Sequence, residues 1–236
     1  MRIPRWNGVI YLSIHMKFIA LGPLLIFIAA VLWGFDGILR RSLYSLPPIT
    51  IVFLEHLIGL IILLPFIVKL WARERLSRHE WVAISVVALL SGVLGTLFFT
   101  SALLAVGFIP FSVVFLMQKL QPIFAVAAAV IFLKENIKRE YILWAGVALI
   151  AGYFVTFPNG IVNFGDGGGY VIAALYALLA AIAWGSSTAF SRYTLIGHSP
   201  TFITGMRFLL TVPFAFIIAI FLGALPTFSS VTYPQV

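Results

Sequence analysis

Four charged side chains lie within or at the edge of long apolar runs, and they are the residues best placed to do chemistry. They are Asp36, Glu55, Lys119 and Arg207. A charged group in the hydrocarbon interior of a membrane is costly, so it normally faces a partner or a water-filled cavity. Side chains placed in this way can bind a polar solute or exchange a proton, and neither step requires bond chemistry.

Glu55 and Lys119 are predicted to lie at a similar depth in the membrane. Glu55 comes seven residues after Pro48, where one apolar run begins, and Lys119 comes eight residues after Phe111. At the helical rise these positions lie about 10 and about 12 Å from the same membrane face. The matched depth predicts either a structural ion pair between two helices or a shared solute or proton site. His56 would assist proton exchange near neutral pH.

A second polar group surrounds Lys119. Gln118 and Gln121 are three residues apart and share one helical face. Pro122 frees a backbone carbonyl in the preceding turn because it lacks an N–H. Two amides in an apolar wall favour either a cavity for amphiphilic or amino-acid-like metabolites or hydrogen bonds between helices. The sequence leaves both alternatives open.

Residues that could catalyse a reaction or hold a metal or cofactor are not grouped along the chain. It has no cysteine and four histidines, which are scattered over connections and one apolar run. An intramembrane transferase would need His, Asp or Glu gathered near one membrane face, so we expect no enzyme, no metal site and no cofactor. The glycine-rich segment Asn163–Gly169 lacks the Lys-Ser/Thr ending of a phosphate-binding loop and is predicted to be an external turn.

The composition indicates which class of protein positions these residues. Charged residues make up 9% of the chain and hydrophobic residues 62%, whereas an average soluble domain is about 25% charged. Such a chain cannot cover a water-exposed surface with polar groups, and we predict an all-α integral membrane protein. The net charge of +8 is spread in short clusters between apolar runs, which is typical of a membrane protein and not of a nucleic-acid-binding domain.

Seven apolar runs approach the length of about 20 residues that a helix needs to cross a bilayer. The predicted spans are Phe18–Leu39, Pro48–Val68, Trp81–Ala105, Phe111–Leu133, Tyr141–Phe157, Tyr170–Phe190 and Pro200–Leu222. Two basic residues, Arg40 and Arg41, lie between spans on one side, and eleven lie on the side of the N-terminus: Arg2, Arg5, Lys17, Lys69, Arg73, Arg75, Arg78, Lys134, Lys138, Arg139 and Arg192. The positive-inside rule therefore predicts a cytoplasmic N-terminus and an extracytoplasmic C-terminus.

Two parts of the chain resemble each other at a nearly constant spacing. The paired positions, at an offset of 151 residues that grows to 152, are Trp33 and Trp184, Asp36 and Ser187, Pro48 and Pro200, and Glu55 and Arg207. Because the offset contains an odd number of spans, the second copy is inverted in the membrane. Inverted repeats are typical of secondary transporters, in which the solute site lies near the midplane between the repeats.

The residues of the repeat have more than one interpretation. Trp33 and Trp184 either close a cavity and contact solute or act as interface anchors and packing residues. Asp36 is expected near the outer end of its helix, solvated or paired with Arg40, with a proton relay as the alternative. Ser187 is the counterpart of Asp36 in the second copy.

Two further features are predicted to be structural. Gly92, Gly95 and Thr96 provide small residues for close helix packing. Glu135 is expected to form a surface salt bridge within the segment Lys134–Glu140.

Four short motifs follow one another in the first two thirds of the chain: Leu32-Trp33-Gly34, Leu120–Ala125, Phe132–Glu135 and Gly146–Gly152. Together they resemble one EamA domain, the repeated unit of the drug/metabolite transporter superfamily. The resemblance implies ten-helix exporters or permeases built from two inverted five-helix repeats. It also implies a basic residue in the region of the second helix, where this chain instead has Glu55 and His56. The implied organisation is a cytoplasmic segment 1–17, a first repeat 18–157, a glycine-rich linker 158–169 and a partial second repeat 170–236.

The sequence therefore predicts a multi-pass secondary transporter of the cell membrane that moves small metabolites or drug-like solutes by alternating access, with proton coupling as one option. The expected partners are the lipid bilayer and a small-molecule solute, with no nucleic acid. Seven spans are about three fewer than the resemblance implies. The alternative is thus a truncated or split fragment that transports only with a partner chain or as a homo-oligomer. The candidate solute-binding residues are Trp33, Asp36, Glu55, His56, Gln118, Lys119, Gln121, Trp184, Ser187 and Arg207.

Overall fold

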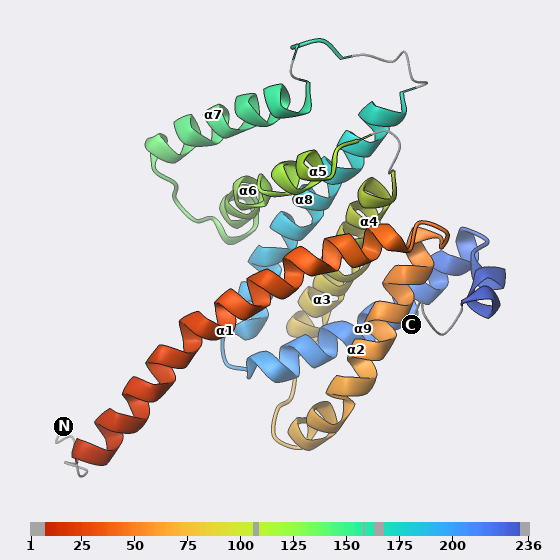
Figure 1. The fold of residues 1–236 in the computed structure, drawn as a ribbon. Coiled ribbons are helices and arrows are strands. Elements are labelled where there is room, and N and C mark those ends of the chain that lie inside the picture. Colours follow the sequence, from red (N-terminus) through yellow and green to blue (C-terminus); the bar gives the residue numbers. More distant parts are fainter. Residues whose placement is uncertain (1–7, 106–108, 158, 163–167, 232–236) are drawn as a thin grey trace. The chain divides into compact units, whose positions relative to one another are not determined.

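A computed structural model describes residues 8–105, 109–157, 159–162 and 168–231 of the chain. All regular structure in these ranges is helical, which confirms the predicted all-α class (Figure 1). The chain divides into two units, Met1–Ser42 and Leu43–Val236. Part of the predicted N-terminal segment (residues 1–7) and most of the glycine-rich turn (residues 163–167) lie outside the described residues.

The first unit contains one long helix, α1 (Gly8–Ser42), with Pro23 inside it. This helix extends beyond the predicted span Phe18–Leu39 at both ends. Near its C-terminal end, the Nε of Arg40 donates a hydrogen bond of 2.7 Å to the carboxylate of Asp36. The two residues are four apart and so share a helical face, and the structure confirms the predicted pairing of Asp36 with Arg40.

The second unit contains the other predicted spans, two of them divided into shorter segments. Its elements are α2 (Pro48–Trp71), α3 (Arg78–Val87), the π-helix η1 (Ala88–Gly95), α4 (Thr96–Leu104), α5 (Phe111–Gln118), α6 (Gln121–Leu133), α7 (Arg139–Thr156), α8 (Gly169–Leu195), α9 (Pro200–Phe221) and the 3₁₀-helix η2 (Leu225–Ser230). The segments α3, η1 and α4 follow one another without a gap and form one span, Arg78–Leu104.

Helix starts in this unit follow local signals in the sequence. Pro48 and Pro200 occupy the first turns of α2 and α9. A backbone N–H there has no partner within the helix, so proline removes no hydrogen bond. Ser77 and Glu80 form a capping box that starts α3: the Ser77 side chain accepts from the Glu80 N–H, and the Glu80 carboxylate accepts from the Ser77 N–H. Ser199 caps α9 in a similar way, accepting from the N–H of Phe202.

Six helices among the described residues are long and apolar enough to cross a membrane. They correspond to six of the seven predicted spans. The seventh is α7, an 18-residue helix with Arg139 and Glu140 in its first turn, which falls outside that group. These helices make the chain a multi-pass membrane protein.

Helices α2 and α9 pack against each other along their length and run in opposite directions. Near the start of α2, Ile49 and Val52 form a cluster with Ala215 and Ala219 from the end of α9. Near the end of α2, Ile67 packs among residues from the first half of α9, including Phe202, Ile203 and Met206. Antiparallel packing of these two helices is the arrangement that an inverted repeat pairing Pro48 with Pro200 requires.

Helix α8 packs against the span α3–η1–α4 and against α5 and α6 (Figure 1). Its packed face consists mainly of alanine, with Ala173, Ala177, Ala180 and Ala181 almost fully buried. Small residues let helix backbones approach closely. In lipid the hydrophobic effect does not drive helices together, so such close packing contacts drive their association. Helix α8 thereby links the segments that carry the predicted polar residues.

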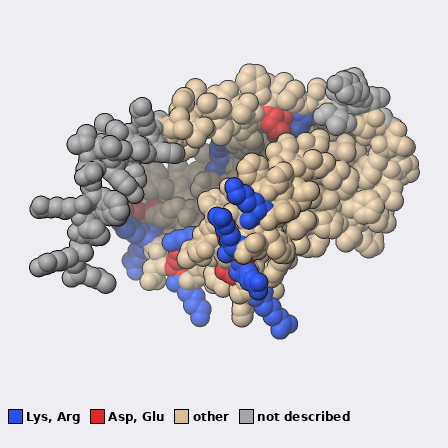
Figure 2. All heavy atoms as spheres, turned by 90° about the horizontal axis from the view of Figure 1, so that it is seen from below, with Lys and Arg blue, Asp and Glu red and all other residues tan. Residues whose placement is uncertain are grey.

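Three connections that carry basic residues lie at the same end of the helices. The Arg192 guanidinium near the end of α8 forms a salt bridge of 2.6 Å with Glu135, which follows α6, and His198 before α9 contacts Glu74 after α2. Figure 2, which looks from below the view of Figure 1, shows Lys and Arg side chains gathered on one part of the surface among a few acidic ones. The Glu135 pairing differs from the predicted local bridge because Arg192 is brought next to it by the packing of α6 on α8.

Candidate functional site

Most of the predicted site residues of the second unit fall into two groups, while Trp184 and Ser187 lie on α8. The first group, which we call the charged seam, comprises Glu55, His56 and Arg207 on α2 and α9, together with Phe208, which was not predicted. The second group, which we call the amide break, comprises Gln118, Lys119 and Gln121 at the interruption between α5 and α6. Trp33 and Asp36 belong to the first unit and are described only within it.

Arg207 is the central residue of the charged seam. Its guanidinium carbon lies 5.2 Å from the centre of the Phe208 ring, in the geometry of a cation–π contact. Its Nε is buried and has no hydrogen-bond partner among the described residues. Glu55 of α2 has an exposed side chain and interacts electrostatically with this guanidinium. The inverted repeat makes these two residues counterparts in its two copies, whereas the neighbour predicted for Glu55 was Lys119.

His56 is held in place beside the same ring. It is buried, its Nδ1 donates a hydrogen bond of 2.8 Å to the Val52 carbonyl, and its ring lies 5.0 Å from the Phe208 ring. The Phe208 side chain lies against Gly59, where no larger residue would fit. The backbone contact fixes the Nδ1–H tautomer of a neutral His56, because a carbonyl oxygen only accepts.

The amide break interrupts the predicted span Phe111–Leu133. Helix α5 ends at Gln118 and α6 begins at Gln121, with tighter i→i+3 hydrogen bonds from Lys119 and Leu120 between them. The break lies where Pro122 removes the hydrogen bond to the carbonyl of Gln118 and its ring would clash with that carbonyl. Interrupted helices of this kind often line the binding sites of transporters.

The two glutamines share one face, as predicted. The Nε2 of Gln118 donates a hydrogen bond of 2.8 Å to the Oε1 of Gln121. The Oε1 of Gln118 is buried without a partner among the described residues, so an acceptor remains available there. Lys119 is exposed, and its pairing with Glu55 stays a prediction.

Helix α8 packs directly on the amide break through Gly185. A Cβ at this position would lie 2.6 Å from the Gln121 carbonyl oxygen and 2.7 Å from the Cβ of Phe124. The neighbouring Trp184 donates from Nε1 to the Ser91 carbonyl at 3.0 Å and lies 5.1 Å from the Phe99 ring. These contacts pack Trp184 against the span α3–η1–α4, and contact of Trp184 with solute stays a prediction. Ser187 is buried and donates to the Trp184 carbonyl of its own helix.

The π-helix η1 packs against both α8 and α9. On one side, the carbonyl of Ser91 accepts from Trp184 and also from the hydroxyl of Thr96. On the other side, Gly92 lies against the Thr211 side chain, and Thr211 donates to the Arg207 carbonyl at 2.8 Å. The predicted role of Gly92 and Gly95 in close packing is confirmed. The π geometry itself was not predicted, although π turns inside helices are frequent at functional sites.

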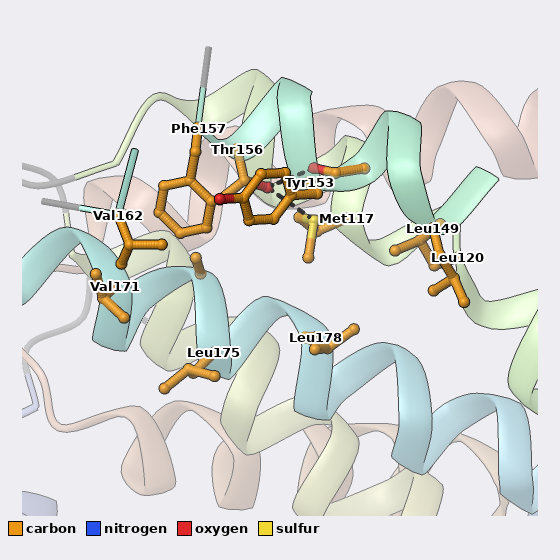
Figure 3. Close-up of a pocket in the computed structure, with 12 residues that line it drawn as sticks. Met117, Leu120, Leu149, Tyr153, Thr156, Phe157, Val162, Val171, Leu175 and Leu178 are labelled. Atoms are coloured by element: carbon orange, nitrogen blue, oxygen red, sulfur yellow. Dashed lines mark hydrogen bonds between the residues drawn. The ribbon is translucent and has the colours of Figure 1, made fainter. Parts of the chain in front are cut away.

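An apolar pocket of about 280 Å³ lies next to the amide break, between α7 and α8 (Figure 3). Met117 and Leu120 flank the break on one wall, and Tyr153 of α7 and Leu178 of α8 contribute to the others. The hydroxyl of Thr156 lies 3.0 Å from the Met117 sulfur and 2.8 Å from the Gly152 carbonyl, so the one hydroxyl proton is already engaged. The pocket suits an apolar or aromatic group and offers nothing to a charged one.

Comparison with protein families matches residues 20–157 to the EamA-like transporter family. The riboflavin transporter ImpX of Fusobacterium nucleatum is 39% identical to the chain over 210 residues, which cover 88% of the chain and 69% of that protein. The family match contains α2 to α7 and thus Glu55 and both glutamines. Arg207 lies beyond it.

Proposed function

Since the chain belongs to the EamA-like transporter family, a family of membrane transporters of small solutes, we propose that it carries a flavin-type solute and binds it at the charged seam. The chemical class of the solute is suggested by the relative named as a riboflavin transporter. No step of this function makes or breaks a covalent bond, so the residues at the site act by binding and not by catalysis.

The buried Nε–H of Arg207 is the observation that carries the proposal. A buried donor without a partner costs free energy, and a native structure retains one where it serves a purpose. A carbonyl oxygen of a bound solute would accept this hydrogen bond. The Phe208 ring beside the guanidinium would at the same time give a planar aromatic ring a surface to stack against.

The charge of the seam favours an uncharged solute. Glu55 offsets the positive charge of Arg207, so the pair together carries little net charge. A solute with a phosphate or carboxylate group would be repelled by Glu55 as it approached Arg207. Riboflavin is neutral, and its planar isoalloxazine ring carries two carbonyl oxygens, so it fits this environment better than its phosphorylated derivatives do.

Alternating access would move the solute past the two interruptions in the helices. The π-helix η1 contacts both α8 and α9. A change of η1 from π-helical to α-helical hydrogen bonding would therefore move α9, which carries Arg207, and α8, which carries Trp184, at the same time. The buried acceptor of Gln118 provides a second polar contact along this route. In this scheme the basic connections after α2, before α7 and before α9 face the cytoplasm, as the charge count predicts.

Uptake into liposomes tests the proposal. We expect liposomes that contain the purified chain to accumulate riboflavin with saturable kinetics, and excess lumiflavin, the same ring system without the hydroxylated chain, to compete. Riboflavin phosphate should compete at least about tenfold less well because Glu55 repels its phosphate, and a mixture of amino acids should do so because it leaves buried polar groups of the site without partners. Uptake equal to that of empty liposomes would contradict the proposal, as would equal competition by amino acids.

A matched pair of arginine variants locates the site. Arg207→Gln should lose uptake, whereas Arg192→Gln, which changes an exposed arginine at the end of α8, should keep it. Loss in both variants would indicate a general dependence on positive charge and would remove Arg207 from the site.

A further inference from the structure

A histidine between two carboxylates joins two connections at one end of the helices. The Nδ1 of His198 lies 3.2 Å from Glu74 Oε2, and its Nε2 lies 3.1 Å from Glu80 Oε1. His198 comes from the connection between α8 and α9, Glu74 from the connection between α2 and α3, and Glu80 from the first turn of α3. We call these three residues the His198 cluster, and none of them belongs to the proposed solute site.

Each carboxylate of the cluster is fixed at the start of a helix. Glu74 accepts hydrogen bonds from the N–H of Ser199 at 3.0 Å and from its hydroxyl at 2.5 Å, directly before α9. Glu80 accepts from the N–H of Ser77 in the capping box of α3. Carboxylates are stabilised at helix N-termini by the helix dipole. Glu74 thus joins the start of α9 to the α2–α3 connection directly through Ser199, and the imidazole of His198 adds the link to Glu80 at the start of α3.

The two contacts of His198 are satisfied together by only one form of the imidazole ring. Both ring nitrogens face carboxylate oxygens, which accept hydrogen bonds and do not donate them when ionised. A neutral imidazole carries one N–H, so it satisfies one carboxylate and presents a lone pair to the other. The imidazolium carries two N–H groups and satisfies both. The hydrogen bonds from Ser199 and His198 outweigh the effect of burial and hold the pKa of Glu74 below its usual value, so this partner is ionised at neutral pH.

The cluster is shielded enough for these contacts to matter. The side chain of His198 is 11% exposed, and those of Glu74 and Glu80 are 16% and 18% exposed. Fully exposed ion pairs contribute little to stability because water and salt screen their charges. The three side chains of the His198 cluster are largely buried, so their contacts are screened less. The ring of Phe202 also lies near His198, at 6.2 Å, and it does not titrate. Among the described residues, the titratable groups in contact with His198 are Glu74 and Glu80, and the charged Arg75 lines a surface pocket together with Glu74 and Phe202.

We propose that the His198 cluster is a proton-operated latch: the imidazolium bridges Glu74 and Glu80 and so adds to the direct contact between Ser199 and Glu74, and loss of its proton weakens the hold between the α8–α9 connection and the start of α3. A histidine side chain exchanges its proton between about pH 5 and 8, which includes the range of cytoplasmic pH. In the predicted orientation the latch closes the cytoplasmic ends of α2, α3 and α9. Acidification of that side would hold the transporter closed there. This consequence for flux rests on the proposed transport function, whereas the latch itself does not.

A distance measurement tests the latch without any transport. The chain contains no cysteine, so Ala72→Cys and Ile196→Cys place two spin labels at exposed positions on the two connections. We expect electron paramagnetic resonance in lipid nanodiscs to show one short distance at pH 6 and a growing population at longer distance by pH 8.5. The loss of one hydrogen bond to a charged group shifts such an equilibrium by roughly tenfold or more.

Three variants of the labelled chain assign the effect to His198. His198→Gln, which cannot donate to both carboxylates as a cation, should abolish the pH dependence. His198→Arg, a cation at both pH values, should keep the short distance throughout. His79→Gln, which changes an exposed histidine next to Glu80, should behave as the unmodified chain does.

Two results would overturn the proposal. One is a distance distribution in the unmodified labelled chain that does not change between pH 6 and pH 8.5, which needs no variant to interpret. The other is a pH dependence that persists in His198→Gln. A pH-dependent distance in a chain that fails to take up riboflavin would support the latch and contradict only the transport function.

Discussion

Gly185→Ala is the smallest change that tests how α8 packs on the amide break. The added methyl group would lie 2.6 Å from the Gln121 carbonyl oxygen, 2.7 Å from the Cβ of Phe124 and 3.0 Å from the backbone nitrogen of Ala125. None of these atoms is the end of a flexible side chain. Relief of the overlap therefore requires α8 to move away from the start of α6, which begins at Gln121.

The sign of the stability change follows from two opposing terms. Alanine is favoured over glycine inside a helix by about 1 kcal/mol. Overpacking of a close contact costs about 1–3 kcal/mol, and the upper part of that range applies because backbone atoms cannot turn aside. We expect a net loss of about 1–2 kcal/mol for Gly185→Ala. At Gly146 on α7 an added methyl group meets nothing within 4 Å. Gly146→Ala therefore gains the higher helix propensity of alanine without any steric overlap.

Thermal unfolding of the two variants in the same detergent gives the comparison. The midpoint should fall for Gly185→Ala and stay equal or rise for Gly146→Ala, and riboflavin uptake should fall for the first variant only. A Gly185→Ala protein as stable as Gly146→Ala would show that α8 does not approach α6 as closely as the structure has it. The role of this contact in shaping the amide break would then be wrong.

Three further changes have expected outcomes. Trp184→Phe removes the donor to the Ser91 carbonyl but leaves the Thr96 donor in place, so it should cost about 1 kcal/mol in unfolding free energy; a loss of several times that would mean that Trp184 has another role. Because the pKa of Glu74 is held below its usual 4.5 by Ser199 and His198, its stabilising effect is present above pH of about 4.5 and is lost as pH falls through the lowered value. The melting temperature should therefore fall as the pH is lowered below about 4.5, and it should fall less steeply in Glu74→Gln. An equal fall in both proteins would refute this. Arg192→Gln removes a salt bridge whose side chains are 65% and 41% exposed, and it should change stability by less than about 1 kcal/mol.

The predicted spans agree well with the helices because they depend on local composition. Apolar runs of sufficient length and prolines at N-termini, such as Pro48 and Pro200, identify α2 and α9 without tertiary information. The π-helix η1 had no comparable signal. Gly92 and Gly95 indicated close packing, but the extra residue in each turn depends on how Trp184 and Thr211 approach from two other helices.

Long-range pairings were the harder part of the site to predict. Glu135 was expected to pair within its own segment, and it pairs instead with Arg192, 57 residues away. His198 lies 124 residues from Glu74 and 118 residues from Glu80 in the chain. Counting the charges in each connection does not predict that these three side chains meet. The capping box at Glu80 was a local signal that could have indicated one fixed carboxylate. The repeat identified Glu55 and Arg207 as counterparts in its two copies, but it carried no signal that the two side chains would interact.

Solute binding by the purified chain tests the charged seam most directly. Quenching of riboflavin fluorescence should be saturable with the unmodified protein and with Arg192→Gln. For Arg207→Gln the affinity should fall by about tenfold or more, because a hydrogen bond from a charged donor is lost. Arg207→Gln protein that keeps its fold and binds riboflavin as tightly as the unmodified chain would contradict the assignment of the site to α2 and α9.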